Sequence, residues 1–166
     1  MSTRKNSNRV RFICYAAAIA ALYTVLTELS ALLGLQGGVI QCRLSEALCV
    51  LVCFTPAAIP GLTIGCLISN LLTGAVVWDV IFGSLATLIG AILGYLIRRC
   101  KWLVPLPTVV ANTLIVPFVL RYAYGAPDAI WFMMLTVGAG EVISAWILGY
   151  AVLFPLEKLN KHKKIF

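Results

Sequence analysis

Residues 40–94 read IQCRLSEALCVLVCFTPAAIPGLTIGCLISNLLTGAVVWDVIFGSLATLIGAILG, and this stretch decides the fold. Almost every residue in it is apolar, yet ionisable and amide side chains recur along it. Polar groups are costly inside a membrane, so they usually face the interior of a helix bundle or a wet cavity and mark a functional site. We therefore expect these side chains to gather at one site; they are Gln41, Arg43, Glu46, Asn70 and Asp79.

The composition is that of an integral membrane protein. Of 166 residues, 61% are hydrophobic and only 11% are charged, and the mean hydropathy is +0.99. Soluble domains carry about 25% charged residues, so an ordinary soluble domain is excluded. The length predicts a single domain over residues 1–166. The apolar run at 12–35 is too long for the hydrophobic core of a signal peptide and is interpreted as a retained first helix.

Six apolar segments are predicted to cross the membrane as helices. They lie at about 10–34, 40–55, 61–73, 78–97, 103–122 and 129–154. Residues 44–55 of the second segment make only about 18 Å of α-helix, whereas a hydrocarbon core is about 30 Å thick. Either this helix begins near Gly38 and carries Arg43 inside, or it is short and capped by an ordered loop, and the second alternative is favoured. Pro56 and Pro60 then reverse the chain, since proline resists helix continuation.

The basic residues predict how these segments are oriented. Eleven of the thirteen Lys and Arg residues fall on one side of a six-helix arrangement, the side that also holds both termini. Cytoplasmic segments carry an excess of Lys and Arg, so both termini are predicted to be cytoplasmic. This distribution explains the net charge of +7 without nucleic acid as a partner. The eleven residues are Arg4, Lys5, Arg9, Arg11, Arg98, Arg99, Lys101, Lys158, Lys161, Lys163 and Lys164.

The acidic residues show the opposite distribution. Glu28, Glu46, Asp79 and Asp128 fall toward the outside. Glu141 lies about 12 residues, or about 18 Å, into the last segment. The cytoplasmic half is built instead of Ile, Leu, Val and Ala. A polar outer half above an apolar floor predicts an outward-facing binding pocket, because an open pore needs polar lining throughout.

Motifs of ATP-binding and catalytic proteins are missing from the sequence. It contains no G-x-x-x-x-G-K-[ST] loop, no H-E-x-x-H and no G-x-S-x-G. The six cysteines lie in apolar segments without zinc-finger spacing. Cys49 and Cys53 are four residues apart, but they lack further ligands and are interpreted as buried apolar side chains. Neither enzymatic activity nor a cofactor or metal is expected.

Small residues recur at helix-packing intervals in two segments. Gly83, Thr87, Gly90 and Gly94 form one face of the fourth segment. The first segment carries two pairs of alanines spaced by four residues. Such faces let another helix approach closely in lipid, so both segments are expected to pack tightly. The alanine pairs are Ala16 with Ala20 and Ala17 with Ala21.

A series of motifs runs in order through nearly the whole chain: QCRLSEA at 41–47, PAAIPGL at 56–62, GC at 65–66, Asn70, WD at 78–79 and GSLATLIG at 83–90. In these residues the sequence resembles the QueT family of queuosine-precursor transporters, which are S components of energy-coupling factor (ECF) transporters. The resemblance implies six helices in a prokaryotic plasma membrane and capture of a 7-deazaguanine compound from outside. It also implies docking on a module of one transmembrane T component and two ATPases. An Ala-x-x-x-Ala motif of the first helix packs on the T component in such proteins, and both alanine pairs match it.

The ligand chemistry that the resemblance implies matches the polar residues. A guanine-like edge offers N–H and NH₂ donors, which one carboxylate can accept together, and a carbonyl that an amide can meet. Glu141 is the leading candidate for this edge and Asn112 for the carbonyl; a structural hydrogen bond between these two is the alternative. Arg43 and Glu46 are candidates as well, or they pair with each other, being three residues apart.

The other candidate residues each have a second interpretation. Gln41 follows a glycine-rich loop at 34–38, which can close as a lid. Asp79 either contacts ligand or serves as a first-turn acid or cap of its helix. Asn70 either contacts ligand or bonds a neighbouring helix. Trp78 and Trp131 either stack on a flat base or belong to the aromatic belt at the membrane surface.

Two further functions are consistent with these observations. One is an S component that binds a different vitamin, since only the ligand would change. The other is a membrane-embedded enzyme that uses Glu141 or Asp79 as a base. The sequence disfavours the enzyme, because no nucleophile–base pair or metal-binding set is evident.

Overall fold

The computed structural model describes residues 2–36 and 40–163, with side chains at 6–36 and 40–161, and within these ranges it is all-helical. Residues 37–39, which hold two glycines of the predicted lid loop, lie outside the described residues, as do the side chains of Arg4, Lys5, Lys163 and Lys164. The elements are α1 (Ser2–Leu32), η1 (Leu44–Cys53), α2 (Ala58–Leu72), α3 (Val77–Leu96), η2 (Lys101–Leu103), α4 (Leu106–Tyr122), α5 (Ile130–Glu141), η3 (Val142–Leu148) and α6 (Gly149–Lys163).

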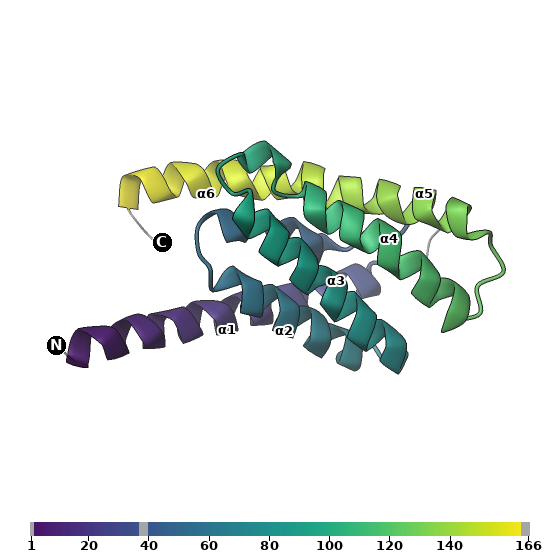
Figure 1. Ribbon diagram of the computed structural model, residues 1–166, viewed down its shortest axis with the longest axis horizontal. Coiled ribbons are helices and arrows are strands. Elements are labelled where there is room, and N and C mark those ends of the chain that lie inside the picture. The colour runs from purple at the N-terminus through teal and green to yellow at the C-terminus, as the bar shows by residue number, and fades with distance from the viewer. Residues whose placement is uncertain (1, 37–39, 164–166) are drawn as a thin grey trace.

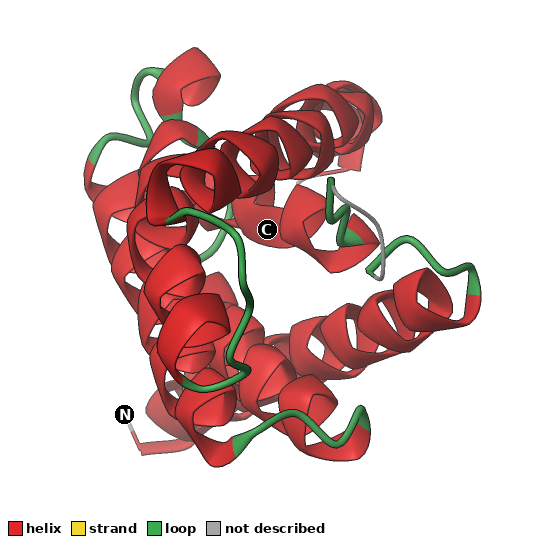
Figure 2. Cartoon of the chain, turned by 90° about the vertical axis from the view of Figure 1, so that its right-hand side faces the viewer, coloured by secondary structure: helices red, strands yellow, loops and turns green. Residues whose placement is uncertain are grey.

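The helices run along one common long axis (Figure 1). Helix α1 begins and helix α6 ends at the same end of the bundle, on the left of Figure 1, and α5, η3 and α6 form one continuous rod. Figure 2 looks at the opposite end, where loops between the helices face the reader. We call the end where α1 begins and α6 ends the terminal end, and the other the loop end.

Four helices are long and apolar enough to cross a membrane among the residues described. Two further apolar helices are shorter. Length and composition therefore identify a multi-pass arrangement in which some segments reach less far than others. The four are Asn6–Leu32, Val77–Leu96, Lys101–Tyr122 and Ile130–Lys161, and the shorter two are Leu44–Cys53 and Ala58–Leu72.

The short second helix, η1, lies at the centre of the bundle. Its residues from Ser45 to Val52 are all buried, and they pack against α1, α2, α3 and α6. It is a 3₁₀-helix rather than the expected α-helix. A 3₁₀-helix rises about 2 Å per residue, so these ten residues reach about 20 Å, where an α-helix of that length reaches about 15 Å. The tighter winding lets a short segment extend through more of the bundle.

The last rod changes its winding in the middle, which the sequence analysis did not predict. The α-helix α5 ends at Glu141, and Val142–Leu148 (η3) forms a π-helix before α6 begins. π-Helical turns inside α-helices frequently occur at functional sites. Here the change of winding begins at the residue after Glu141.

Glycines allow two of the helix pairs to touch. A Cβ atom at Gly61 or Gly65 of α2 would lie 2.9 Å from the carbonyl oxygen of Ala16 or Ala20 of α1, respectively. A Cβ atom at Gly90 of α3 would lie 2.8 Å from the Cα atom of Thr108 in α4. Cβ atoms do not approach other atoms this closely, so these positions require glycine for the packing seen here.

Candidate functional site

A small polar cavity lies among η1, α3, α4 and α5, and it brings together five of the residues that the sequence singled out. Its volume is about 20 Å³. Charged and amide side chains from segments far apart in sequence share it with a few small and apolar residues. We call this the polar cavity; its lining is Gln41, Arg43, Glu46, Gly83, Thr87, Asn112, Val116, Val137 and Glu141.

Gln41 and Arg43 reach the cavity from an extended segment. Hydrogen bonds donated by its backbone hold this segment to the end of the preceding turn and to the π-helix. The Cys42 N–H donates to the carbonyl oxygen of Leu35 at 2.9 Å. The Arg43 N–H donates to Ser144 Oγ in the π-helix at 3.1 Å. The backbone of Gln41 lies directly against α5, where a Cβ atom at Gly140 would be 2.0 Å from the Gln41 carbonyl oxygen. Glycine at position 140 is thus required for this segment to sit where it does.

Glu46 is held by a tyrosine rather than by Arg43. The Tyr23 hydroxyl donates to Glu46 Oε1 at 2.5 Å, and both side chains are buried. Among the described side chains, the ion pair observed is that of Lys101 and Glu157. Arg43 and Glu46 thus form no direct ion pair in this structure: residue 43 is extended and precedes the helix. Their opposite charges still attract each other at longer range.

The side chain of Arg43 points instead to a series of hydrogen-bonded residues outside the polar cavity. Its Nη1 lies 3.5 Å from Asn70 Oδ1, and Asn70 Nδ2 donates to the Asp79 carbonyl oxygen of the neighbouring helix at 3.3 Å. The Tyr124 hydroxyl donates to Asp79 Oδ2 at 3.0 Å. Asp79 also lies in the first turn of α3. Asn70 and Asp79 do not line the polar cavity but connect to it through Arg43. Each is placed as its second interpretation proposed: Asn70 bonds a neighbouring helix, and Asp79 is a first-turn acid.

Glu141 is the residue in the cavity whose bonding is incomplete. It is 8% exposed, and its Oε2 atom has no hydrogen-bond partner among the described residues. Asn112, which is 5% exposed, lines the same cavity as this carboxyl group. A buried polar atom without a partner is costly and calls for an explanation, such as a missing ligand or water. The carboxyl group of Glu141 is therefore not fully bonded by the described residues.

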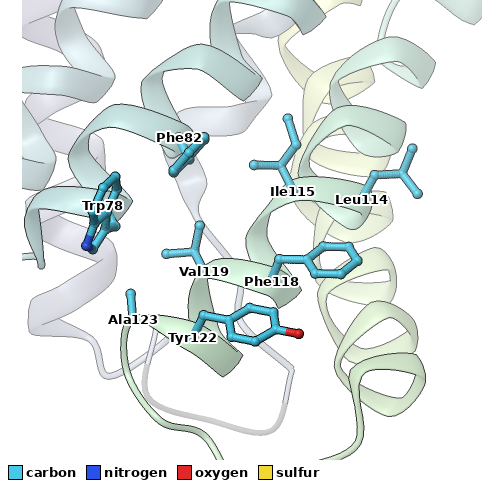
Figure 3. Close-up of a pocket in the computed structure, with 8 residues that line it drawn as sticks. All are labelled: Trp78, Phe82, Leu114, Ile115, Phe118, Val119, Tyr122 and Ala123. Atoms are coloured by element: carbon cyan, nitrogen blue, oxygen red, sulfur yellow. The ribbon is translucent and has the colours of Figure 1, made fainter.

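The two tryptophans lie away from the polar cavity. Trp78 is 57% exposed and lines a separate apolar groove of about 420 Å³ between α3 and α4. Figure 3 shows it with Phe82, Phe118 and Tyr122, which line the same groove. Trp131 is 67% exposed and packs edge-on against Phe132. Neither tryptophan is brought to the residues that the polar cavity gathers.

The four alanines of α1 face two directions. Ala20 is buried and Ala16 is half-buried, and their carbonyl oxygens contact α2 at Gly65 and Gly61. Ala17 and Ala21 are exposed. All four border one apolar groove of about 700 Å³ along α1 and α2. The groove thus offers a small-residue surface on the outside of the bundle.

Three cavity features escaped the sequence analysis. Tyr23 lies in an apolar helix, where a tyrosine is normally interpreted as a residue of the hydrophobic core. Gly83 and Thr87 were assigned to helix packing because they share a spacing with Gly90, but they line the polar cavity. Thr87 donates its hydroxyl to the Gly83 carbonyl oxygen at 3.0 Å. The hydroxyl of Thr87 was the signal in the sequence that could have distinguished the cavity-lining part of the stripe, at Gly83 and Thr87, from the helix-packing part at Gly90.

The lining of the polar cavity offers both hydrogen-bond donors and acceptors. Carboxylates at positions 46 and 141 accept hydrogen bonds, while the guanidinium of Arg43 and the amides of Gln41 and Asn112 donate them. In the described part of the chain, no group of three or more His, Cys, Asp or Glu residues is placed to hold a metal ion.

Comparison with known proteins identifies the family. The model of the QueT transporter family matches residues 13–158. A curated relative from Lactococcus lactis subsp. cremoris (strain MG1363), the "Queuosine precursor transporter QueT", is 44% identical over 81 residues, which are 49% of this chain and 47% of the relative. The chain thus spans about half the length of the curated relative that it matches. No solved structure matches it. Because the family model covers most of its length, the chain belongs to the QueT transporter family, a family of transporters and not of enzymes.

Proposed function

We propose that this chain is the substrate-binding S component of an ECF-type importer that captures a queuosine precursor from outside the cell. The precursor is a 7-deazaguanine base, queuine or queuosine. Membership of the QueT transporter family supports this proposal, as does the printed name of the relative. The observation that carries it is the buried, unpartnered Oε2 atom of Glu141 in the polar cavity.

The contacts to the base follow from donor and acceptor matching. The Glu141 carboxylate accepts the ring N–H and the NH₂ group of a guanine-like edge together. The amide NH₂ of Asn112 or Gln41 meets the base carbonyl. Arg43 and Glu46 shape the cavity and contact the remaining edge. Asn70 and Asp79 position the side chain of Arg43. Trp78 and Trp131 belong to the aromatic belt at the membrane surface.

The chain is a multi-pass membrane protein, and we propose six crossings with both termini in the cytoplasm of a prokaryote. The start of α1 and the end of α6 at one end of the bundle fit an even number of crossings. The basic residues cluster at that terminal end, and cytoplasmic segments are rich in Lys and Arg. The polar cavity then opens toward the loop end, which faces the outside.

Partner subunits supply the driving force in this proposal. A T component docks along the groove of α1 and α2, where Ala17 and Ala21 are exposed and allow close helix approach. Two ATPases complete the module. The double variant Ala17→Leu/Ala21→Leu should lose co-purification with the T component while retaining ligand binding. Ala18→Leu, on the other side of α1, is the matched control and should retain both.

The experiment that tests the substrate is calorimetric titration of the purified chain with queuine, the nitrile and aminomethyl precursor bases, and guanine as a control. We expect tight binding of at least one deazaguanine without ATP. Glu141→Gln should weaken it at least about a hundredfold, because two hydrogen bonds to a charged group contribute about 1.5–3 kcal/mol each. Glu157→Gln, the same change at the terminal end, should not affect it.

Two results would count against the proposal. Binding to none of the deazaguanines would remove the substrate assignment, and a panel of riboflavin and biotin would then test an S component for another vitamin. Unchanged affinity in Glu141→Gln would remove Glu141 from the site. Thermal unfolding of each variant shows whether the fold is retained.

A further inference from the structure

The polar cavity alone is too small for the proposed ligand. Its volume is about 20 Å³, and a cavity needs about 10–15 Å³ to hold a single water molecule. A fused bicyclic base has many more atoms than a water molecule. A ligand that reaches Glu141 must therefore extend into neighbouring space.

A second cavity adjoins the polar cavity on the side of the loop end. Its volume is about 210 Å³. It shares Gln41 and Val137 with the polar cavity, so these two residues form the partition between them. We call it the rim cavity; the lining residues used below are Phe132, Met133, Thr136 and Asp128.

The rim cavity is mostly apolar, with one carboxylate. Phe132 and Met133 provide flat and flexible apolar surface. The Thr136 hydroxyl donates to the Met133 carbonyl oxygen of its own helix at 3.1 Å, so it is already bonded. Asp128 is the charged residue of this lining. A ligand group in the rim cavity would thus meet an apolar wall and a single negative charge.

The turn that carries Asp128 is well bonded. The Arg121 side chain donates from Nη1 to the Ala126 carbonyl oxygen at 2.7 Å, and the Ala126 N–H donates to Leu120 at 3.0 Å. Gly125 has φ +68°, a conformation that favours glycine. Within the described side chains, Asp128 is in no ion pair. The nearby guanidinium is bonded to the turn, and the carboxylate is left to meet a ligand.

We propose that the two cavities are the halves of one ligand site, and that the rim cavity binds the substituent at position 7 of the deazaguanine, with Asp128 selecting a cationic group there. This inference rests on the proposed function. The guanine edge contacts Glu141 in the polar cavity, and the ring system passes between Gln41 and Val137. The five-membered ring and its substituent then lie against Phe132 and Met133. An aminomethyl ammonium pairs with the Asp128 carboxylate, while a nitrile gains no such contact.

The test separates the two halves of the site by ligand and by variant. The affinities of unsubstituted 7-deazaguanine, 7-cyano-7-deazaguanine and 7-aminomethyl-7-deazaguanine are measured by calorimetry on the purified full chain. The variants are Asp128→Asn, Thr136→Phe and the control Glu157→Gln. Asp128 is exposed, so its amide variant is expected to fold, and thermal unfolding checks this.

We expect the wild type to bind the aminomethyl base about tenfold more tightly than the unsubstituted base, and Asp128→Asn to abolish that preference without changing affinity for the unsubstituted base. Thr136→Phe fills the rim cavity and should weaken both substituted bases more than the unsubstituted one. A preference that survives Asp128→Asn, or an equal loss for all three bases, overturns the inference while the proposed function stands. Binding of queuine but of none of the three bases likewise overturns the inference while the proposed function stands. If the wild type binds neither queuine nor any of the three, the proposed function itself falls, and this inference with it.

Discussion

The two halves of the small-residue stripe on α3 share one spacing but have different surroundings. At the loop end, Gly83 and Thr87 line the polar cavity. Toward the terminal end, Gly90 packs directly on Thr108 of α4, and a Cβ atom at Gly94 would lie 3.1 Å from the Val104 carbonyl oxygen. The same residue types therefore make room for polar groups at one end and bring helices into contact at the other. The residues of α4 and η1 that lie opposite the stripe determine whether a given position lines a cavity or packs against a helix.

The largest effect is expected at Gly140 of α5, which contacts the backbone of Gln41 beside the polar cavity that the loop-end half of the stripe lines. In Gly140→Ala the new methyl group would meet the Gln41 carbonyl oxygen at 2.0 Å, and backbone cannot yield as a side chain does. We expect ligand binding to be lost and the free energy of unfolding to fall by about 3 kcal/mol. Titration and thermal unfolding in detergent measure both. Gly138→Ala, which meets the Thr113 side chain at 3.2 Å, is the control; an equal loss there would contradict this account.

A smaller effect, on stability alone, is expected at the terminal-end half of the stripe. Gly90→Ala places a methyl group 2.8 Å from the Thr108 Cα atom, so α3 and α4 must separate. We expect the free energy of unfolding to fall by about 1–3 kcal/mol. The affinity of the folded protein for the deazaguanine should stay within about twofold of wild type. A selective loss of affinity would show that the two halves of α3 are not independent.

The corresponding change in the loop-end half should reverse that pattern. In Gly83→Ala the nearest atoms are Asn70 Nδ2 at 3.1 Å and Asp79 Oδ1 at 3.3 Å, and both are ends of side chains. We expect less than about 1 kcal/mol of destabilisation, since side chains can shift. The added methyl group narrows the polar cavity, so ligand affinity should fall by about tenfold. If Gly83→Ala kept wild-type affinity but had a much lower melting temperature, the proposed difference between the two halves of the stripe would be wrong.

The smallest effect is expected at the ion pair of the terminal end. Lys101 Nζ lies 2.6 Å from Glu157 Oε1, and both side chains are partly exposed. Exposed ion pairs contribute about 0.2–1 kcal/mol, so Glu157→Gln should lower stability by no more than this, and by less at high salt. Melting curves at two salt concentrations measure it. A change in ligand affinity would mean that the ends of the bundle are coupled.

Much of the architecture was accessible from the sequence because lipid imposes strong constraints. Helices are the structures that satisfy backbone groups within one segment of a membrane protein, so the apolar runs identified the helical regions. The cost of burying polar groups in lipid pointed to Gln41, Arg43, Glu46, Asn112 and Glu141, and the structure gathers all five around one cavity. Their roles in binding stay predictions.

The rest depended on tertiary contacts that leave no periodic pattern. A run such as Leu48–Cys53 is apolar on every face, so nothing in it distinguishes a 3₁₀-helix from an α-helix; its winding is set by neighbours on all sides. The same holds for the π-helix after Glu141. Tyr23 could not be paired with Glu46 from the sequence, because the two residues meet only when α1 and η1 pack together.

The burial of η1 on all sides has a consequence for how the protein is made. Membrane insertion machinery recognises segments of about 20 apolar residues, and η1 has ten, preceded by Arg43 and containing Glu46. Lipid alone does not stabilise such a segment across a bilayer. We therefore expect η1 to take up its position late in biogenesis, after the longer helices have been inserted and can surround it. Because η1 carries Glu46 to Tyr23, we expect this late step also to complete the polar cavity.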